Sequence, residues 1–566
     1  MLLKFSDYKY ERPNMNKLRE SFNELLNNFR TADTLEVQED IISKINKLRS
    51  EFDTMFNIVG VRYSINTTDE FYSKEVEFFD EVTPEFEDLT TSFYKELVNS
   101  KFRNNLEEKF GKLLFTLADL KLKTFSPEII EDLQKENKLV TEYSKIKGSA
   151  KILFEGEERN LSQMTPFTMS TDRDIRIRAN KAVSVFYTEN ESEFDRIYDE
   201  LVKVRTTIAK KLGYKNYVQL GYDRLDRSDY NSEMVAGYRK QVLENIVPIV
   251  SELKKRQQKR LNLDNLTFAD EALKFLSGNP TPKGDPEWIV NNGKKMYKEL
   301  SPETDEFFTF MTDHELMDLV AKKGKDTGGF CTYFSEYKSP FIFSNFNGTS
   351  DDVDVLTHET GHAFQGYSSR GFEIPEYMWP TLEACEIHSM SMEFLTWPWM
   401  KLFFEEDENK YKFQHLSEAL IFIPYGVTVD EFQHWVYENP EATPGERKTI
   451  WREIEKKYLP HRDYADDEFL NKGGFWFRQG HIFQNAFYYI DYTLAQVCAF
   501  QFWVKANKDR KSAWKEYLRL CKAGGSKSFL GLVDLANLKN PFEEGSIKSF
   551  IAPIKEWLDS IDDSKL

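Results

Sequence analysis

The chain has 566 residues, of which 40% are hydrophobic and 30% charged, a composition typical of folded globular proteins. Its formal net charge of −18 argues against nucleic acid and anionic membranes as partners, because both require a basic protein surface. No run of about 18 apolar residues occurs, and no apolar stretch follows Met1, so we expect neither a transmembrane helix nor a secretory signal. The four cysteines lack CxxC spacing, which favours a reducing, cytoplasmic location over a disulfide framework.

The N-terminal part of the chain has helical periodicity. Apolar residues recur every three or four positions across 14–58, and the pattern repeats with many intervening charges across 66–145. Pro84 and Pro127 stand where helices could begin. We therefore expect residues 1–150 to form a helical region of their own.

Two short segments interrupt the helical pattern further along the chain. Residues 153–159 surround a glycine and could form a hairpin, and helical periodicity then fills 170–261. Residues 328–334 and 341–346 are rich in aromatic and β-branched side chains and flank a turn at 338–340, which predicts two strands. The sequence thus predicts a mainly α-helical protein with a small β-sheet before residue 350.

The strongest chemical signal is an HExxH motif. On a helix, residues four positions apart lie on one face, so His358 and His362 could bind one zinc ion at about 2.0–2.1 Å. Glu359 could take a proton from a zinc-bound water. The alternative is a surface helix with two solvated histidines, and the apolar Val353 and Leu356 just before the motif argue against it.

Gly361 lies within this predicted helix, although glycine costs about 1 kcal/mol there relative to alanine. The residue could leave room for a neighbouring backbone or a substrate. It could also be a tolerated mid-helix glycine, and the sequence leaves both explanations open.

A catalytic zinc usually has a third protein ligand, and the next helical segment offers three candidates. Glu383, Glu386 and Glu393 share one helical face. Spacing alone does not choose among them, because a glutamate in such an acidic chain is commonly a solvated carboxylate.

Several segments together resemble the zinc oligopeptidases related to thimet oligopeptidase and bacterial oligoendopeptidase F, most closely the Pz-peptidase-like branch. The matching segments are 172–176, 345–346, 354–362, 381–393, 481–492 and 522–528. The resemblance extends from about residue 165 to 555, whereas residues 1–150 share only helical texture.

The resemblance also implies a choice of third ligand. In that family the ligand is a glutamate followed three residues later by a serine and seven residues later by a glutamate. Glu386, Ser389 and Glu393 fit this pattern, which implies Glu386 as the third ligand of one zinc ion per chain. Glu383 and Glu393 then resemble the outer carboxylates that commonly orient metal-bound imidazoles.

Further residues follow from the same resemblance. His481, Tyr489 and Tyr492 would bind the substrate carbonyl and stabilise the oxyanion, and a tetrahedral intermediate does require positioned donors. Tyr488 is the alternative to Tyr489 in this role, or a substrate-binding residue, because family members differ by about one residue in this spacing. The strand that ends near Asn345 could bind an extended peptide by β-addition, with Asn345 as a substrate-binding residue.

The resemblance implies a mainly α-helical zincin, with helical walls around a deep substrate channel and a small β-sheet next to the zinc helix. Residues 1–150 would form part of the channel wall, and 151–566 would form the zinc metallopeptidase catalytic domain. The expected activity is hydrolysis of internal bonds in short unstructured peptides, with Glu359 as general base. Two other functions stay open: a dipeptidyl carboxypeptidase with the same zinc site, and a peptide-binding protein without catalysis. The oligomeric state and the side-chain preference are not fixed by the sequence.

Overall fold

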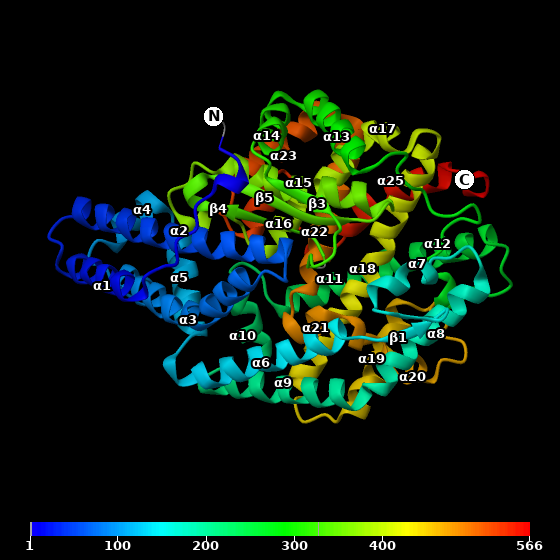
Figure 1. The fold of residues 1–566 in the computed structure, drawn as a ribbon, viewed down its shortest axis with the longest axis horizontal. Helices are drawn as coiled ribbons and strands as arrows, with labels where there is room; N and C mark the ends of the chain where they lie inside the picture. Colours follow the sequence, from blue (N-terminus) through cyan, green and yellow to red (C-terminus); the bar gives the residue numbers. More distant parts are fainter. Residues whose placement is uncertain (1–2, 327) are drawn as a thin grey trace.

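A computed structural model describes residues 3–326 and 328–566, and α-helices dominate it (Figure 1), which confirms the mainly helical prediction. The first helices are α1 (Met15–Thr31), α2 (Leu35–Ile65), α3 (Glu70–Val98), α4 (Arg103–Phe110), α5 (Lys112–Thr124) and α6 (Ile130–Gly148). The central helices are α7 (Thr165–Thr168), α8 (Arg173–Glu189), α9 (Glu191–Lys211), α10 (Tyr217–Arg224), α11 (Ser232–Asn245), α12 (Val247–Arg260), α13 (Pro286–Leu300) and α14 (Pro302–Asp313). The later helices are α15 (Asp351–Ser369), α16 (Leu382–Leu395), α17 (Lys401–Phe404), α18 (Glu408–Glu438), α19 (Pro444–Tyr458), α20 (Glu468–Asn471), α21 (Gly480–Gln484), α22 (Tyr489–Lys508), α23 (Arg510–Ala523), α24 (Phe529–Leu535) and α25 (Ser546–Ser560).

One of the two predicted proline boundaries is wrong. Pro84 lies inside α3, where a proline removes a backbone hydrogen bond and typically costs about 3 kcal/mol. The helix continues through it because Phe79, Val82 and Leu89 bury its apolar face on both sides of the proline. Pro127, in contrast, does open the 3-10 turn that leads directly into α6.

Both predicted strand pairs are confirmed. Strands β1 (Ile152–Phe154) and β2 (Glu157–Arg159) form an antiparallel hairpin around Glu155 and Gly156, whose φ values of 52° and 80° suit a tight two-residue turn. Strands β4 (Phe330–Phe334) and β5 (Ser339–Phe346) pair antiparallel, and β3 (Met317–Val320), which the sequence did not reveal, pairs parallel to β5.

The sheet order is β3-β5-β4, so β5 is central and bonded on both sides. The strand that ends near Asn345 therefore has no free edge for an extended peptide, and β-addition at this strand is wrong. Both of its neighbours, β3 and β4, are edge strands.

The N-terminal helices α1–α5 project from the body of the molecule, at the left of Figure 1. They share an apolar cluster that also takes in Ile374 and Tyr377 from the later chain. Arg49 of α2 forms a partly buried ion pair with Glu376 at 2.7 Å, which fastens this arm to the segment between α15 and α16. The division of the chain at residue 150 stays a prediction.

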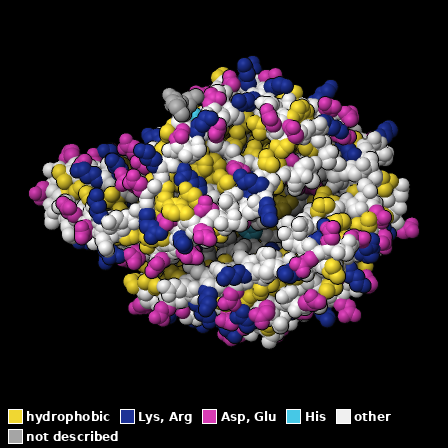
Figure 2. Space-filling view, in the orientation of Figure 1, with side chains coloured by type: hydrophobic (Ala, Val, Ile, Leu, Met, Phe, Trp, Pro, Cys, Tyr) yellow, Lys and Arg dark blue, Asp and Glu magenta, His cyan; other side chains and the backbone are white. Residues whose placement is uncertain are grey.

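The centre of the body is a stack of helices below the three-stranded sheet (Figure 1), in which α16 packs against both α15 and α22. Figure 2 shows a recess between the upper and lower parts of the molecule, with histidine colour visible inside it. Among the residues that the structure describes, no helix is long and apolar enough to cross a membrane. The four cysteines, all described, are free, in agreement with the sequence.

Candidate metal centre and active site

Helix α15 carries the HExxH motif and starts directly behind the sheet. The Asp352 carboxylate accepts hydrogen bonds from the backbone N–H groups of Asn347 and Gly348, both at 2.8 Å, and so fixes the turn between β5 and α15. The acidic first turn also complements the positive end of the helix dipole. Val353 and Leu356 are fully buried, so the motif lies on a helix that enters the core. The alternative of a solvated surface helix is therefore wrong.

Gly361 marks the closest approach of α15 to α16. A Cβ atom at this position would lie 2.6 Å from the His388 carbonyl oxygen and 2.6 Å from the Cα of Ser389. Both atoms belong to the α16 backbone, so no side chain fits between the helices. Of the two explanations for this glycine, room for a neighbouring backbone is confirmed.

This close approach brings three potential ligands together. The ligand atoms of His358, His362 and Glu386 all lie within 4.8 Å of one another. Glu386 Oε2 is 3.3 Å from His358 Nε2 and 3.5 Å from His362 Nε2. Ligands about 2.0–2.1 Å from one ion in tetrahedral geometry lie roughly 3.3 Å apart, so the donor set and its spacing fit a zinc ion. Burial alone would raise the pKa of Glu386. The two imidazoles outweigh this effect and hold that pKa well below its usual range.

The two other glutamates of α16 occupy different surroundings. Glu393 accepts a hydrogen bond from His358 Nδ1 at 2.7 Å, the position from which an outer carboxylate orients a metal-bound imidazole. Glu383 is buried instead beside Asp491 and Arg227, and burial together with the Asp491 charge raises its pKa to about 8. The predicted role in orienting an imidazole therefore fits Glu393, and the structure gives no such contact for Glu383 among the described residues.

Glu359 lies next to the metal ligands in a dry environment. It is 7% exposed, and its Oε2 atom has no hydrogen-bond partner within the described part of the chain. Burial raises its pKa, while the imidazoles of His358 and His362 partly offset this rise. A buried carboxylate with an open lone pair and an elevated pKa suits a general base.

His481 and two of the tyrosines line a cavity together with the metal ligand His358. A cavity of about 430 Å³ is lined by His358, Glu393, His481, Tyr489 and Tyr492, along with residues of α18 and Gln479. The Tyr492 hydroxyl is 3.4 Å from His481 Nε2.

The structure also separates the two neighbouring tyrosines. The Tyr488 hydroxyl donates to Glu386 Oε1 at 3.2 Å, so it lies beside a metal ligand. The Tyr489 ring lies 5.0 Å from the His481 ring and packs on Phe422, further along the cavity wall. Tyr488 is therefore placed closer to the metal ligands than Tyr489.

A buried arginine shapes the turn that presents Tyr488. Phe487 has a φ of 68°, an uncommon conformation for a bulky residue. Arg227 donates to the Phe487 carbonyl oxygen at 2.6 Å and to Asp491 Oδ1 at 2.5 Å, and thereby holds the start of α22 in place.

The Asn345 side chain forms hydrogen bonds to the backbone of the segment before β4. Its side-chain nitrogen donates to the carbonyl oxygens of Asp326 and Gly328, at 2.9 and 2.8 Å. These bonds fasten the segment before β4 to the sheet. Next to it, a Cβ atom at Gly329 would lie 3.7 Å from Glu359 Oε1, so this segment adjoins the predicted general base.

The sequence did not identify two residues of the site, Gln479 and His415. Gln479 Nε2 lies 2.8 Å from His481 Nδ1, and the Tyr425 hydroxyl donates to Gln479 Oε1 at 2.8 Å. His415 donates to Glu393 at 2.8 Å. No local motif marks either residue. The scarcity of histidine, eight in the whole chain, was the one signal that could have singled out His415.

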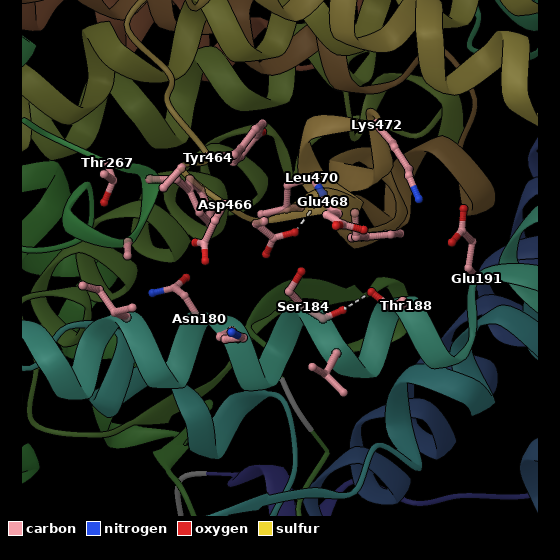
Figure 3. Close-up of a pocket in the computed structure, with 18 of the residues that line it drawn as sticks. Asn180, Ser184, Thr188, Glu191, Thr267, Tyr464, Asp466, Glu468, Leu470 and Lys472 are labelled. Carbon is pink, nitrogen blue, oxygen red and sulfur yellow. Dashed lines mark hydrogen bonds between the residues drawn. The ribbon is translucent and has the colours of Figure 1, made fainter.

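A second cavity, of about 510 Å³, lies away from the metal ligands between α8 and the segment 464–472. In Figure 3, Asn180 and Ser184 of α8 face Asp466 and Glu468 across this cavity. None of the predicted site residues lines it, so the chemistry belongs to the smaller cavity at α15.

Comparison with known proteins agrees with this site. Residues 5–125 match the Peptidase M3 N-terminal domain, and residues 304–551 match Peptidase family M3. The structure of PZ peptidase A with an inhibitor is 61% identical, covers 99% of this chain and 100% of that chain, and superposes with a TM-score of 0.95. A Bacillus anthracis protein provisionally described as an oligoendopeptidase F is 58% identical, with full coverage of both chains and a TM-score of 0.91.

A more distant relative is Oligopeptidase PepF of Bacillus subtilis, which is 22% identical over 496 residues, or 81% of this chain and 71% of the relative. Sequence identity near 60% over the whole length, together with the clustered histidines and glutamate, establishes the assignment. The chain belongs to peptidase family M3.

Proposed function

We propose that the protein is a zinc-dependent oligoendopeptidase that hydrolyses internal bonds of short, unstructured peptides and binds one zinc ion per chain. The observation that carries this proposal is the convergence of His358, His362 and Glu386, whose ligand atoms lie within 4.8 Å of one another. Beside them, the buried Oε2 of Glu359 has no hydrogen-bond partner among the described residues. The names of the relatives, an oligopeptidase and PZ peptidase A, support the same class of substrate.

When bound, zinc supplies a Lewis acid and lowers the pKa of a coordinated water to about 7. Glu359 accepts the proton of the attacking water at Oε2, and its buried position keeps the proton from exchanging with bulk solvent. Glu359 then delivers this proton to the nitrogen of the leaving amine.

The substrate carbonyl oxygen, which becomes negatively charged during the reaction, needs hydrogen-bond donors on the side of the cavity opposite the metal ligands. Gln479 Nε2 donates to His481 Nδ1, which leaves the proton of His481 on Nε2, toward Tyr492 and the cavity. Burial lowers the pKa of His481 and so favours this neutral form. His481 Nε2 and Tyr492 act as donors that stabilise the oxyanion, and Tyr488 joins them when its one hydroxyl proton turns from Glu386 Oε1 to the substrate oxygen. This assigns Tyr488, not Tyr489, to the position nearest the ligands, and leaves Tyr489 to contact the bound peptide.

The peptide binds in extended form along β4. This strand is at the edge of the sheet, and its Phe330 end follows the segment that adjoins Glu359. The other end is covered, because Asn57 of α2 donates to the Tyr333 carbonyl oxygen at 3.3 Å. Backbone pairing at an edge strand recognises extended chains and disregards most side chains. A folded protein offers no such extended segment to the recess in Figure 2.

The test is a product map on peptides whose N- and C-termini are both blocked, analysed by mass spectrometry. An oligoendopeptidase cleaves internal bonds of these peptides, whereas a dipeptidyl carboxypeptidase requires a free C-terminus and leaves them intact. Binding without any cleavage would identify a peptide-binding protein and overturn the proposal.

A series of peptides of increasing length tests whether the recess restricts access to the site or whether the site lies in an open cleft. Peptides of about 5 to 40 residues are compared with a reduced, unfolded protein of similar composition. A steep fall in rate beyond a limiting length supports restricted access, and equal cleavage of long and short chains contradicts it.

A further inference from the structure

Three hydrogen bonds lead outward from His358 in one line. His358 Nδ1 donates to Glu393 Oε1 at 2.7 Å, and the other oxygen, Glu393 Oε2, accepts from His415 Nε2 at 2.8 Å. His415 Nδ1 in turn accepts from Trp397 Nε1 at 3.2 Å. The line joins α15, α16 and α18, so it connects the metal ligand to the helix that forms the far wall of the cavity.

The tryptophan fixes the tautomer of His415. An indole nitrogen can only donate a hydrogen bond, so the His415 Nδ1 atom facing Trp397 must be the unprotonated nitrogen. The ring proton therefore lies on Nε2 and points at Glu393. Rotation of the ring is blocked by Phe394 and Tyr411, whose ring centroids are 4.9 and 5.6 Å from that of His415.

Among the described residues, no other acid lies at hydrogen-bond distance from this proton. The next carboxylate, Asp354, is 4.0 Å from His415 Nε2 and accepts from the Tyr411 hydroxyl. His415 is 8% exposed, so water has little access to the bond. Glu393 is thus held at both oxygens, by one bond from the metal ligand and one from His415.

We propose that His415, set in one tautomer by Trp397, is a positioning residue that fixes the Glu393 carboxylate and thereby sets how tightly the site holds its metal. The inference rests on the metal site of the proposed function. A glutamate side chain has three rotatable bonds, and one hydrogen bond does not fix them all. The second bond, from His415, keeps Glu393 Oε1 in line with His358 Nδ1, which fixes the orientation of the imidazole toward the metal.

The test is the rate at which zinc-loaded protein releases its metal to an excess of a zinc-binding dye. Zinc content per chain is measured first. Loss of an outer-shell partner typically weakens metal binding by 10–100-fold, so we expect about tenfold faster release for His415→Leu. His415→Gln retains an N–H donor for Glu393, and we expect release within about threefold of the unchanged protein.

Two further variants complete the design. Trp397→Phe keeps an aromatic ring but removes the donor that fixes the tautomer, and we expect about threefold faster release. It also tests the proposal if His415→Leu does not fold. His434→Leu is the matched control, because His434 is equally buried on the same helix, α18, but pairs with Asp430. Release from this control should match the unchanged protein.

The outcomes are distinct. Faster release for His415→Leu, with recovery in His415→Gln and none of the change in His434→Leu, supports the proposal. Release at the original rate from both His415→Leu and Trp397→Phe overturns it. If the unchanged protein holds no zinc at all, the metal site fails and this inference fails with it.

Discussion

Replacing Gly361 by alanine should loosen the metal site although alanine is the better helix former. The new Cβ would lie 2.6 Å from backbone atoms of α16, and ordinary contact begins at 3.4 Å, so α15 and α16 must separate locally by 0.8 Å (3.4 − 2.6). Such overpacking typically costs about 1–3 kcal/mol, and the gain in helix propensity returns about 1 kcal/mol. We expect a net loss of up to about 2 kcal/mol in the free energy of unfolding of the metal-free protein.

The same displacement acts on the ligands, because α15 supplies His358 and His362 and α16 supplies Glu386. Metal–ligand distances tolerate only about ±0.2 Å, well under the separation required. Zinc affinity should therefore fall by at least about tenfold. The assays are urea unfolding of the metal-free protein and chelator competition for zinc.

Gly60 offers a matched control for this substitution. It lies within α2, and nothing is within 4 Å of the position that its Cβ would occupy. Gly60→Ala should raise the free energy of unfolding by about 0.4–1 kcal/mol and leave zinc affinity unchanged. If Gly361→Ala behaves like this control, the close approach of the two helices is not tight and the reasoning is refuted.

Three other predictions follow from the site and its supports. Glu386→Ala should strip zinc from the purified protein, whereas Glu383→Ala should retain it, and metal analysis giving the reverse result would exclude Glu386 as the ligand. Gln479→Leu removes the donor to His481 Nδ1. Measured on a quenched peptide, kcat should fall about 10-fold or more while KM changes little. An unchanged kcat would show that Gln479 does not set the tautomer of His481 for catalysis. Burial would raise the pKa of Glu376, but the Arg49 charge outweighs burial and holds that pKa below the usual value of about 4.3. The ion pair should therefore stabilise the fold fully above about pH 5 and progressively less as the pH falls below about 4, where Glu376 becomes protonated. The thermal midpoint of Glu376→Gln should accordingly depend less on pH between 6 and 3 than that of the unchanged protein, and parallel curves would contradict this.

Patterns local in the sequence predicted local structure well. Helical spacing gave α1 and α2, and the glycine in 153–159 marked the hairpin of β1 and β2. Local patterns failed where a distant contact decides the outcome. Pro84 does not break α3, because burial of the apolar face on either side outweighs the lost hydrogen bond.

The candidate site was also predictable where it depends on local spacing, and not where it depends on distant contacts. The HExxH spacing identified His358 and His362, since four residues make one turn of a helix. The order of strands in the sheet depends on β3, a strand of four residues that pairs parallel to β5 although β4 lies between them in the chain. Because the sequence did not reveal β3, the central position of β5 could not be read from it. His415 lies more than fifty residues from His358 and joins the site only through the packing of α18, for which no spacing rule exists.

The proposed function requires that one zinc site, with Glu359 as its base, hydrolyses peptides. The most direct test measures zinc content and hydrolysis of a short quenched peptide on the same samples of the unchanged protein and Glu359→Gln. We expect one zinc per chain in both proteins, and a rate in the variant that is lower by about 10²–10⁴-fold. Loss of zinc in step with activity would show that Glu359 supports the metal and not the proton transfer. Full activity in the variant would exclude Glu359 as the general base.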